Sequence, residues 1–521
     1  MIPVAFLVVF FFYPLQAILA ESLRGGEILS RLGSSTTWRV VRFTFLQATI
    51  STVATLAAGL PLAYLFSHYR FPGRRLLRAV ATVPFVLPTV VVGSAFLALL
   101  GPGGWLGRDA SGSLFAIIAA HVFYNTAVVL RTVGTLWERL DPQLGEAARA
   151  LGAGPLRRTW SVTLPLLRPA LAAAASLVFL FSFSSFGVIL ILGGLRYATL
   201  EVEIYRQTFG FLDLGAASVL ALIQLGVVAV TLLTYVRYQR RTATQVTLRS
   251  PIDVARPPDS LRARGMVAAI LGMAGILIGL PLAALVIRSF QGQAGLSLQA
   301  YRALDDAHFG DLATPVQSAT NSLVIAVVAT LIALGVGIPA AIAVAPRAKA
   351  AELLDTLIML PLGASAVTLG FGLLLALDSP IDLRTSRLLV PIGHALVAIP
   401  FVVRLVVPVL RSIRTSLREA AAMLGASPAA VMRKVDLPLV GRGLGAAAGF
   451  AFLVSMGEFG ATLFLARPDT PTLPLSIARL LSRPGAFPEA MAMGTILAAI
   501  AASAILVIDR VAEPNGPSRE F

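Results

Sequence analysis

No cysteine occurs among the 521 residues, which excludes a disulfide framework and a metal site built on thiolates. Charge is also scarce: 13% of the residues are Asp, Glu, Lys or Arg, against roughly 25% in soluble proteins, whereas 57% are hydrophobic. Water therefore cannot be the main solvent of the folded chain. Lysine occurs only as Lys349 and Lys434, and neither belongs to a G-x-x-x-x-G-K-[ST] phosphate-binding loop, so this chain is not the ATPase of any system it serves.

Acidic residues are fewer than basic ones, which gives a net charge of +16. The basic residues lie in short clusters between apolar runs and not on one polar domain, so we expect them to orient a membrane protein and not to bind nucleic acid.

Long apolar runs predict an all-α membrane protein with twelve transmembrane helices. About 20 apolar residues in a helix cross the roughly 30 Å hydrocarbon layer. The first run lacks the basic start of a signal peptide, so we expect it to be a membrane helix. The predicted spans are 1–20, 40–67, 79–100, 114–133, 169–192, 216–236, 266–287, 320–344, 353–376, 388–408, 443–466 and 490–508.

The segments that connect these spans carry Lys and Arg unequally. Successive segments lie on alternate sides of the membrane, so they form two sets. One set holds 24 such residues and the other holds 13. The richer set is 68–78, 137–168, 237–265, 345–351 and 411–442. Because positive charge is retained on the cytoplasmic side, these segments and both termini are predicted to be cytoplasmic.

The chain also contains an internal repeat at an offset of 273 residues. Seven of the matches are Pro88 with Pro361, His121 with His394, Arg131 with Arg404, Glu146 with Glu419, Gly152 with Gly425, Pro165 with Pro438, and Phe186 with Phe459. One period contains an even number of spans, so the two six-helix halves run parallel, with a pathway expected at their interface.

The repeat predicts a division into domains. The first half comprises residues 1–236 and the second 266–510. The basic, proline-containing segment 237–265 is expected to be a cytoplasmic linker, and 511–521 a cytoplasmic tail.

One cytoplasmic segment of each half, 141–169 and 414–442, predicts an exposed pair of short helices. Asp141 and Ser416 are suited to cap the first helix of each pair, with Ser416 and Glu419 forming a capping box. Gly152 and Gly425 should end that helix. The second helix should begin at Pro155 or Pro428 and end at Leu164–Pro165 or Leu437–Pro438, where the chain returns to the membrane.

The repeated core of these segments is a Glu followed by two alanines. Small side chains let a helix lie close in another protein's groove, and the glutamate supplies a charge. The alternative is an amphipathic helix on lipid headgroups, which the second copy at equal spacing disfavours. The residues concerned are Glu146, Ala147, Ala148 and Gly152, and Glu419, Ala420, Ala421 and Gly425.

The two segments resemble the EAA loop of membrane subunits of binding-protein-dependent ABC importers, E-A-A-x(3)-G with Leu-Pro twelve residues later. The resemblance covers both halves. It implies the type I importer permease fold (MetI-like), a bacterial inner-membrane location, and an EAA loop that couples to each of two cytoplasmic ATPase subunits. It also implies an extracytoplasmic solute-binding protein. Ala422 stands where the first copy has Arg149, so the two docking sites need not be equivalent.

Fusion of both halves, with stretches such as FSSFGVILILGG and LVSMGEFGATLF, is similar to permeases for thiamine and for ferric iron. Thiamine or a related small solute is the first expectation and ferric iron the second. The rival function is a twelve-span secondary transporter of the major facilitator type. Its basic loop after the second span usually contains an acid, which HYRFPGRRLLR lacks.

Four polar residues within spans are candidates for a solute pathway: Glu458, Ser185, His121 and His394. A carboxylate near the bilayer centre costs about 2.5–3.5 kcal/mol, so Glu458 should face the interior or water, where it would attract a cation or hydrogen-bond a helix break. Its repeat counterpart is Ser185, and the two histidines can equally serve as neutral links between helices. We find no catalytic constellation, no cluster at metal spacing and no sign of a cofactor.

Overall fold

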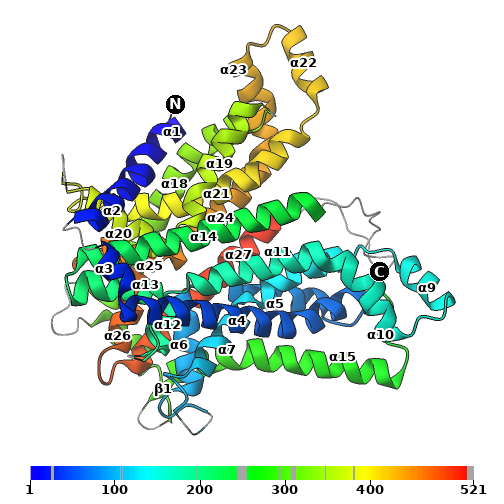
Figure 1. Ribbon diagram of the computed structural model, residues 1–521, viewed down its shortest axis with the longest axis horizontal. Coiled ribbons are helices and arrows are strands. Elements are labelled where there is room, and N and C mark those ends of the chain that lie inside the picture. Colours follow the sequence, from blue (N-terminus) through cyan, green and yellow to red (C-terminus); the bar gives the residue numbers. More distant parts are fainter. Residues whose placement is uncertain are drawn as a thin grey trace. The chain divides into compact units, whose positions relative to one another are not determined.

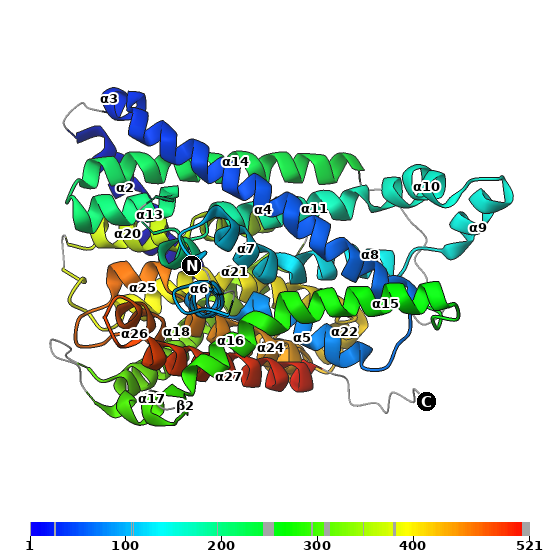
Figure 2. The ribbon, with the colours of Figure 1, turned by 90° about the horizontal axis from the view of Figure 1, so that it is seen from below.

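The computed structural model describes residues 2–24, 28–105, 107, 109–194, 196–242, 255–292, 295–306, 313–346, 348–378 and 382–512 (Figures 1 and 2). The centre of the predicted linker, 243–254, and most of the predicted tail, 513–521, lie outside these residues. The chain forms two compact units. Unit 1 is Met1–Gly26 with Ser297–Phe521, and unit 2 is Glu27–Leu296.

The described part of unit 2 is helical apart from two short paired strands. Its helices are α3 (Ile28–Gly33), α4 (Ser35–His68), α5 (Arg74–Val86), α6 (Thr89–Leu100), α7 (Leu114–Val129), α8 (Thr135–Trp137), α9 (Pro142–Ala150), α10 (Pro155–Arg158), α11 (Leu164–Phe183), α12 (Gly187–Leu192), α13 (Leu200–Tyr205), α14 (Leu214–Thr242), α15 (Leu261–Ala274) and α16 (Leu280–Ser289). Its antiparallel strands are β1 (Gln291–Gly292) and β2 (Gly295–Leu296).

Unit 1 repeats much of this order. Its helices are α1 (Ile2–Leu7), α2 (Tyr13–Leu23), α17 (Gln299–Arg302), α18 (Pro315–Val344), α19 (Lys349–Gly363), α20 (Ala366–Ala376), α21 (Leu389–Ser412), α22 (Thr415–Met423), α23 (Pro428–Val431), α24 (Leu437–Gly457), α25 (Gly460–Leu465), α26 (Leu473–Leu481) and α27 (Phe487–Ala512).

The compact units exchange the first helices of the two sequence halves. Helices α1 and α2 pack on α18 and α20 of unit 1, whereas α15 and α16 pack on α4 and α6 of unit 2. The contact of α2 with α20 depends on Gly372, where an added Cβ would lie 3.1 Å from Pro14 and 3.0 Å from Ile18. Small residues of this kind let membrane helices approach closely.

Among the described residues, nine helices are long and apolar enough to cross a membrane, and three bent pairs bring the number to twelve. The sequence prediction of an all-α, twelve-span protein is thus confirmed in outline. On α18, exposed apolar side chains follow one face, which suits contact with lipid; they are Leu323, Val324, Val327 and Leu331.

Two predicted spans, 79–100 and 353–376, are sharply bent. The axes of α5 and α6 differ by 105°, and those of α19 and α20 by 97°. At the first bend Leu87 is extended because the α conformation is disfavoured before a proline, here Pro88. At the second bend the Ser365 hydroxyl caps α20, accepting from the Thr368 N–H at 3.0 Å.

The repeat register changes at these bends. Pro84 and Pro361 each lie two residues before the end of their helix, at an offset of 277, so Pro361 corresponds to Pro84 and not to the predicted Pro88. The first half has four more residues than the second between this proline and its histidine, His121 or His394, and these restore the offset of 273. Positions 84 and 88 of the first half are both prolines, so the fixed offset of 273 residues paired Pro361 with Pro88.

Candidate functional site: coupling loops and two polar helix breaks

Helices α9 and α22 bear the two Glu-Ala-Ala motifs, and each stands with its short partner helix at one end of its own unit (Figure 1). The two helices end with the same geometry. Leu151 and Leu424 both have φ −81° and ψ 11°, and Gly152 and Gly425 follow with φ of 81° and 82°. Glycine adopts this left-handed conformation without the steric cost of a Cβ, so the predicted helix ends are confirmed.

The local hydrogen bonds at these ends also repeat. The Ala153 N–H donates to Ala148 O at 2.9 Å, and the Ala426 N–H to Ala421 O at 3.0 Å. These six-to-one bonds satisfy carbonyls that a helix end leaves without intrahelical partners. The two motifs are therefore presented by nearly identical backbones.

The starts of the two loops agree only in part with the sequence. The Asp141 carboxylate caps α9 by accepting from the Gln143 N–H at 2.9 Å, as predicted. The predicted capping box of Ser416 and Glu419 is wrong, because α22 begins at Thr415, one residue before Ser416, and no side chain caps it. Ser427 caps α23, accepting from the Ala430 N–H at 3.3 Å.

The predicted turns at Leu164–Pro165 and Leu437–Pro438 are wrong as well. A π-helical turn, Thr159–Thr163 or Met432–Asp436, precedes each Leu-Pro pair, and the helix continues as α11 or α24. Such π turns re-route the backbone hydrogen bonds, so a proline can follow them without ending the helix.

The side chains of the loops are largely exposed. Glu146, Ala147, Glu419 and Ala420 are exposed, while Ala148 and Ala421 are half-buried. Leu151 and Leu424 are 87% and 88% exposed, although they are apolar. Sequence reasoning missed these two leucines; the signal was their repeated position directly before the glycine that ends the helix.

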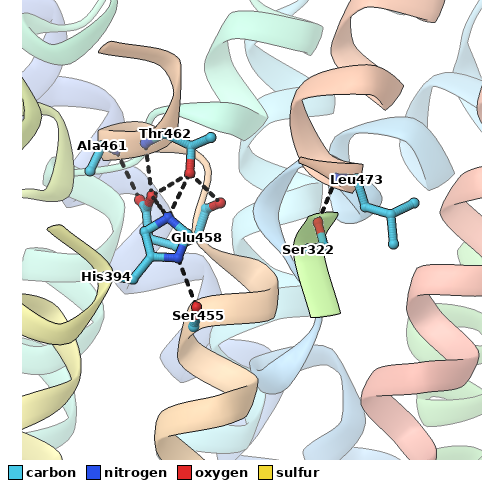
Figure 3. Close-up of polar contacts among 7 residues, drawn as sticks. All are labelled: Ser322, His394, Ser455, Glu458, Ala461, Thr462 and Leu473. Atoms are coloured by element: carbon cyan, nitrogen blue, oxygen red, sulfur yellow. Dashed lines mark hydrogen bonds and ion pairs between the residues drawn. The ribbon is translucent and has the colours of Figure 1, made fainter. Parts of the chain in front are cut away.

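The second site is a buried polar cluster in unit 1, where the predicted span 443–466 breaks between α24 and α25 (Figure 3). The Glu458 side chain is 5% exposed. Its Oε1 accepts from the Ala461 N–H at 3.0 Å, and its Oε2 accepts from the Thr462 N–H at 2.9 Å and from the Thr462 hydroxyl at 3.0 Å. Both oxygens thus bind the first N–H groups of α25, which have no partner within the helix.

His394 connects this break to neighbouring side chains. Its Nδ1 lies 2.8 Å from Ser455 Oγ, and its Nε2 lies 2.8 Å from Thr462 Oγ1 and 3.3 Å from Glu458 Oε2. If Ser455 donates to Nδ1, Nε2–H can donate to Thr462, whose hydroxyl then donates to Glu458. A neutral imidazole satisfies every group in this chain. The geometry favours the structural reading of Glu458.

Unit 2 holds the matching break between α11 and α12. His121 Nε2 lies 2.8 Å from Ser185 Oγ, and its Nδ1 lies 2.9 Å from Ser51 Oγ. Each histidine therefore contacts the side chain at the break of its own half, Glu458 for His394 and Ser185 for His121. The position of these four side chains in a solute pathway stays a prediction.

In each unit, a side-chain hydroxyl on α4 or α18 accepts a hydrogen bond from the first N–H of a further short helix, α13 or α26. The Ser322 hydroxyl accepts from the Leu473 N–H at 2.7 Å, beside the cluster in Figure 3, and the Thr44 hydroxyl accepts from the Leu200 N–H at 3.0 Å. Unit 2 adds two buried acids that sequence reasoning missed. Glu201 accepts from Gln224 and Glu203 from Gln207, both at 2.7 Å, where unit 1 has Pro474 and Ser476.

Comparison with known proteins supplies the family. A family model, "Binding-protein-dependent transport system inner membrane component", matches residues 55–244 and 333–515, which is most of the chain and once in each half. Both copies of the Glu-Ala-Ala motif fall within the matches. This result gives no support to the secondary-transporter alternative.

Several curated proteins are similar over most of the chain. The thiamine transport system permease protein ThiP of Brucella suis is 27% identical over 516 residues, which cover 96% of this chain and 92% of that protein. ThiP of Escherichia coli is 28% identical over 453 residues, covering 84% and 82%. The sulfate transport system permease protein CysT of Salmonella typhimurium is 33% identical over 229 residues, covering 40% and 79%.

Family membership implies in general an ATPase and a solute-binding protein as partners. The duplicated match, the repeated Glu-Ala-Ala loops and the apolar helices agree on one assignment. This chain belongs to the family of binding-protein-dependent transport system inner membrane components, as a fused, multi-pass transmembrane subunit of an ABC importer.

Proposed function

We propose that α9 and α22 each dock one cytoplasmic ATPase subunit, so that two copies act on one chain. The observation that carries this proposal is the repeated surface itself: the same helix end in both units, with an exposed leucine beside an exposed glutamate and alanine. A single exposed apolar side chain is ordinary, but one at the same place in both units suits contact with another protein. Glu146 and Glu419 would supply one anchored charge at each contact.

This proposal assigns ATP hydrolysis to the partner subunits. The chain itself would form the solute pathway and transmit the movement of the docked subunits to its membrane helices. An extracytoplasmic solute-binding protein would deliver the solute on the opposite face.

The proposed orientation places the loops and both termini in the cytoplasm. Its support is the excess of Lys and Arg in the segments on the side of the loops, 24 against 13. Two of those segments also meet in unit 2, where the Arg70 N–H donates to Arg256 O at 2.9 Å. A single membrane side for 68–78 and the linker is thus consistent with the fold.

We further propose thiamine, or a closely related small cation, as the solute. Its support is that relatives aligned over 96% and 84% of the chain are named thiamine permeases. Ferric iron is the second candidate from the sequence.

The substrate proposal is tested with vesicles that contain the chain, the cognate ATPase and the cognate binding protein. We expect uptake of labelled thiamine that needs ATP and that unlabelled thiamine suppresses. Ferric citrate and sulfate, added in the same excess, should leave this uptake unchanged. Uptake of labelled iron without uptake of thiamine would refute the thiamine assignment and leave the coupling proposal intact.

A further inference from the structure

The carboxylate of Glu146 on α9 already has a partner within this chain. Arg256 Nη2 lies 3.3 Å from Glu146 Oε1, and the two residues are 110 positions apart in the sequence. In the part of the chain that the structure describes, no hydrogen bond or ion pair involves the side chain of Glu419, the repeat counterpart. The two proposed docking loops therefore present their glutamates differently.

Arg256 reaches Glu146 because the end of the linker is fixed to unit 2. The Arg256 N–H donates to His68 O at 3.0 Å, and Arg256 O accepts from the Arg70 N–H at 2.9 Å. These two bonds form a parallel bridge opposite Tyr69, and the neighbouring Ala255 is 6% exposed. An exposed ion pair alone is weak, but here backbone hydrogen bonds hold one partner in place.

The segment continues directly into a membrane-length helix. Ser260 caps α15, accepting from the Ala263 N–H at 3.1 Å, and α15 packs along α4 (Figure 2). Residues 255–260 therefore lie between two fixed points, the end of α4 and the start of α15. We call residues 255–260 the linker clamp.

The second loop is attached by other residues. Arg418 on α22 donates through Nε to Asp436 Oδ1 at 2.8 Å and through Nη2 to Leu410 O at 3.2 Å. In the first half, Gly145 and Thr163 stand at the positions of Arg418 and Asp436, so this ion pair has no equivalent there. Unit 1 thus fixes its loop without using the Glu of the motif.

We propose that the linker clamp forms part of the first ATPase-docking surface, and that Arg256 holds Glu146 until an ATPase subunit displaces it. This inference rests on the proposed coupling role of Glu146. An ATPase subunit that binds α9 must compete with Arg256 for Glu146. One that binds α22 meets Glu419, which has no such partner among the described residues. The ion pair of Arg256 with Glu146 therefore makes ATPase binding at the first loop weaker than at the second.

The test isolates the first loop and changes only Arg256. In a Glu419→Arg background, which disables the second loop, the dissociation constant of the purified cognate ATPase is measured for the full chain in detergent. Arg256→Ala should lower that constant by about two- to fivefold, the range of an exposed ion pair. Arg262→Ala removes the same charge from an exposed arginine on α15 and should leave the constant unchanged.

Two controls separate this inference from the proposal beneath it. In a Glu146→Arg background, which leaves only the second loop, Arg256→Ala should have no effect. Adding Glu146→Arg to Glu419→Arg should remove binding altogether. Binding that persists in that double variant overturns both the coupling role and the clamp. Binding that needs Glu146 but is equal in Arg256→Ala and Arg262→Ala, or weaker in Arg256→Ala, overturns the clamp alone.

Discussion

At the scale of single residues, the two halves stabilise the break in their fifth span with different side chains. Each fifth span is broken, and each break is reached by a histidine from the fourth span. At the unit 1 break a carboxylate accepts two backbone N–H groups of α25, whereas unit 2 has the Ser185 hydroxyl at that place. Close packing leaves little room there, since a Cβ on Gly370 would lie 2.8 Å from the Ala461 Cα. We therefore propose a structural role for Glu458.

Glu458→Gln should lower the stability of the fold and leave transport by the folded protein unchanged. The amide oxygen can replace one carboxylate oxygen, but the NH₂ group then faces a donor, so a buried N–H or hydroxyl loses its acceptor at a cost of about 1–3 kcal/mol. We expect a lower melting temperature in detergent and unchanged ATP-dependent uptake per folded molecule.

Ser185→Ala is the matched control, since it removes the corresponding group of unit 2 and should cost only about 1 kcal/mol. An unchanged melting temperature for Glu458→Gln together with lost uptake would instead assign the carboxylate to the solute.

At the scale of elements, the turn before α14 contains a strained residue. Leu212 has φ of 55°, and Gly485, its repeat counterpart, has φ of 84°. The left-handed conformation costs a residue with a Cβ roughly 1–2 kcal/mol. Asp213 holds the turn: its N–H donates to Gln207 O at 2.8 Å, and its carboxylate accepts from the Ala216 N–H at 2.9 Å and from Arg31 at 2.5 Å. Partial burial would raise the pKa of Asp213, but these hydrogen bonds lower it.

Leu212→Gly should raise the free energy of unfolding by about 0.5–1 kcal/mol, because relief of strain exceeds the entropy cost of glycine. The Leu212 side chain is 77% exposed, so little packing is lost. Gly485→Ala should act in the opposite direction, although no atom lies within 4 Å of the added Cβ. Thermal unfolding of both variants in detergent checks this prediction, and a destabilised Leu212→Gly would contradict it.

Some elements could be predicted from sequence because their causes are local. Hydropathy locates the spans, and the glycines at 152 and 425 mark helix ends because only a residue without Cβ adopts that conformation freely. The continuation through Pro165 could not be predicted, since it depends on a π turn. Nor could the contact of Arg256 with Glu146, which joins residues distant in sequence through backbone pairing at His68 and Arg70.

At the scale of the whole molecule, the repeat in the sequence and the packing in space do not coincide. The sequence divides near the linker, but each compact unit includes the first helix of the other half. No pattern of hydropathy encodes that exchange, because every span is apolar and the choice of neighbour depends on fit. A close contact of this kind is that of Gly372 on α20 with Pro14 and Ile18 on α2, where an added Cβ would approach to 3.0 Å.

In the coupling that we propose, each of the two units carries one docking loop. On that proposal, each loop transmits the movement of its own ATPase subunit to the helices of its unit. We therefore predict that transport needs both loops. The two loops should bind the ATPase subunit with different affinity, because only Glu146 is paired with Arg256.

The most direct test of this coupling is ATPase association with membrane vesicles of defined orientation. Cognate ATPase should sediment with inverted vesicles that contain the unmodified chain, but not with right-side-out vesicles. It should fail to sediment with inverted vesicles containing Glu146→Arg together with Glu419→Arg, since a reversed charge at each contact costs about 2–5 kcal/mol. Equal amounts of the chain in both preparations provide the control. Undiminished sedimentation with the double variant would contradict coupling through these loops, and sedimentation with right-side-out vesicles would contradict the orientation.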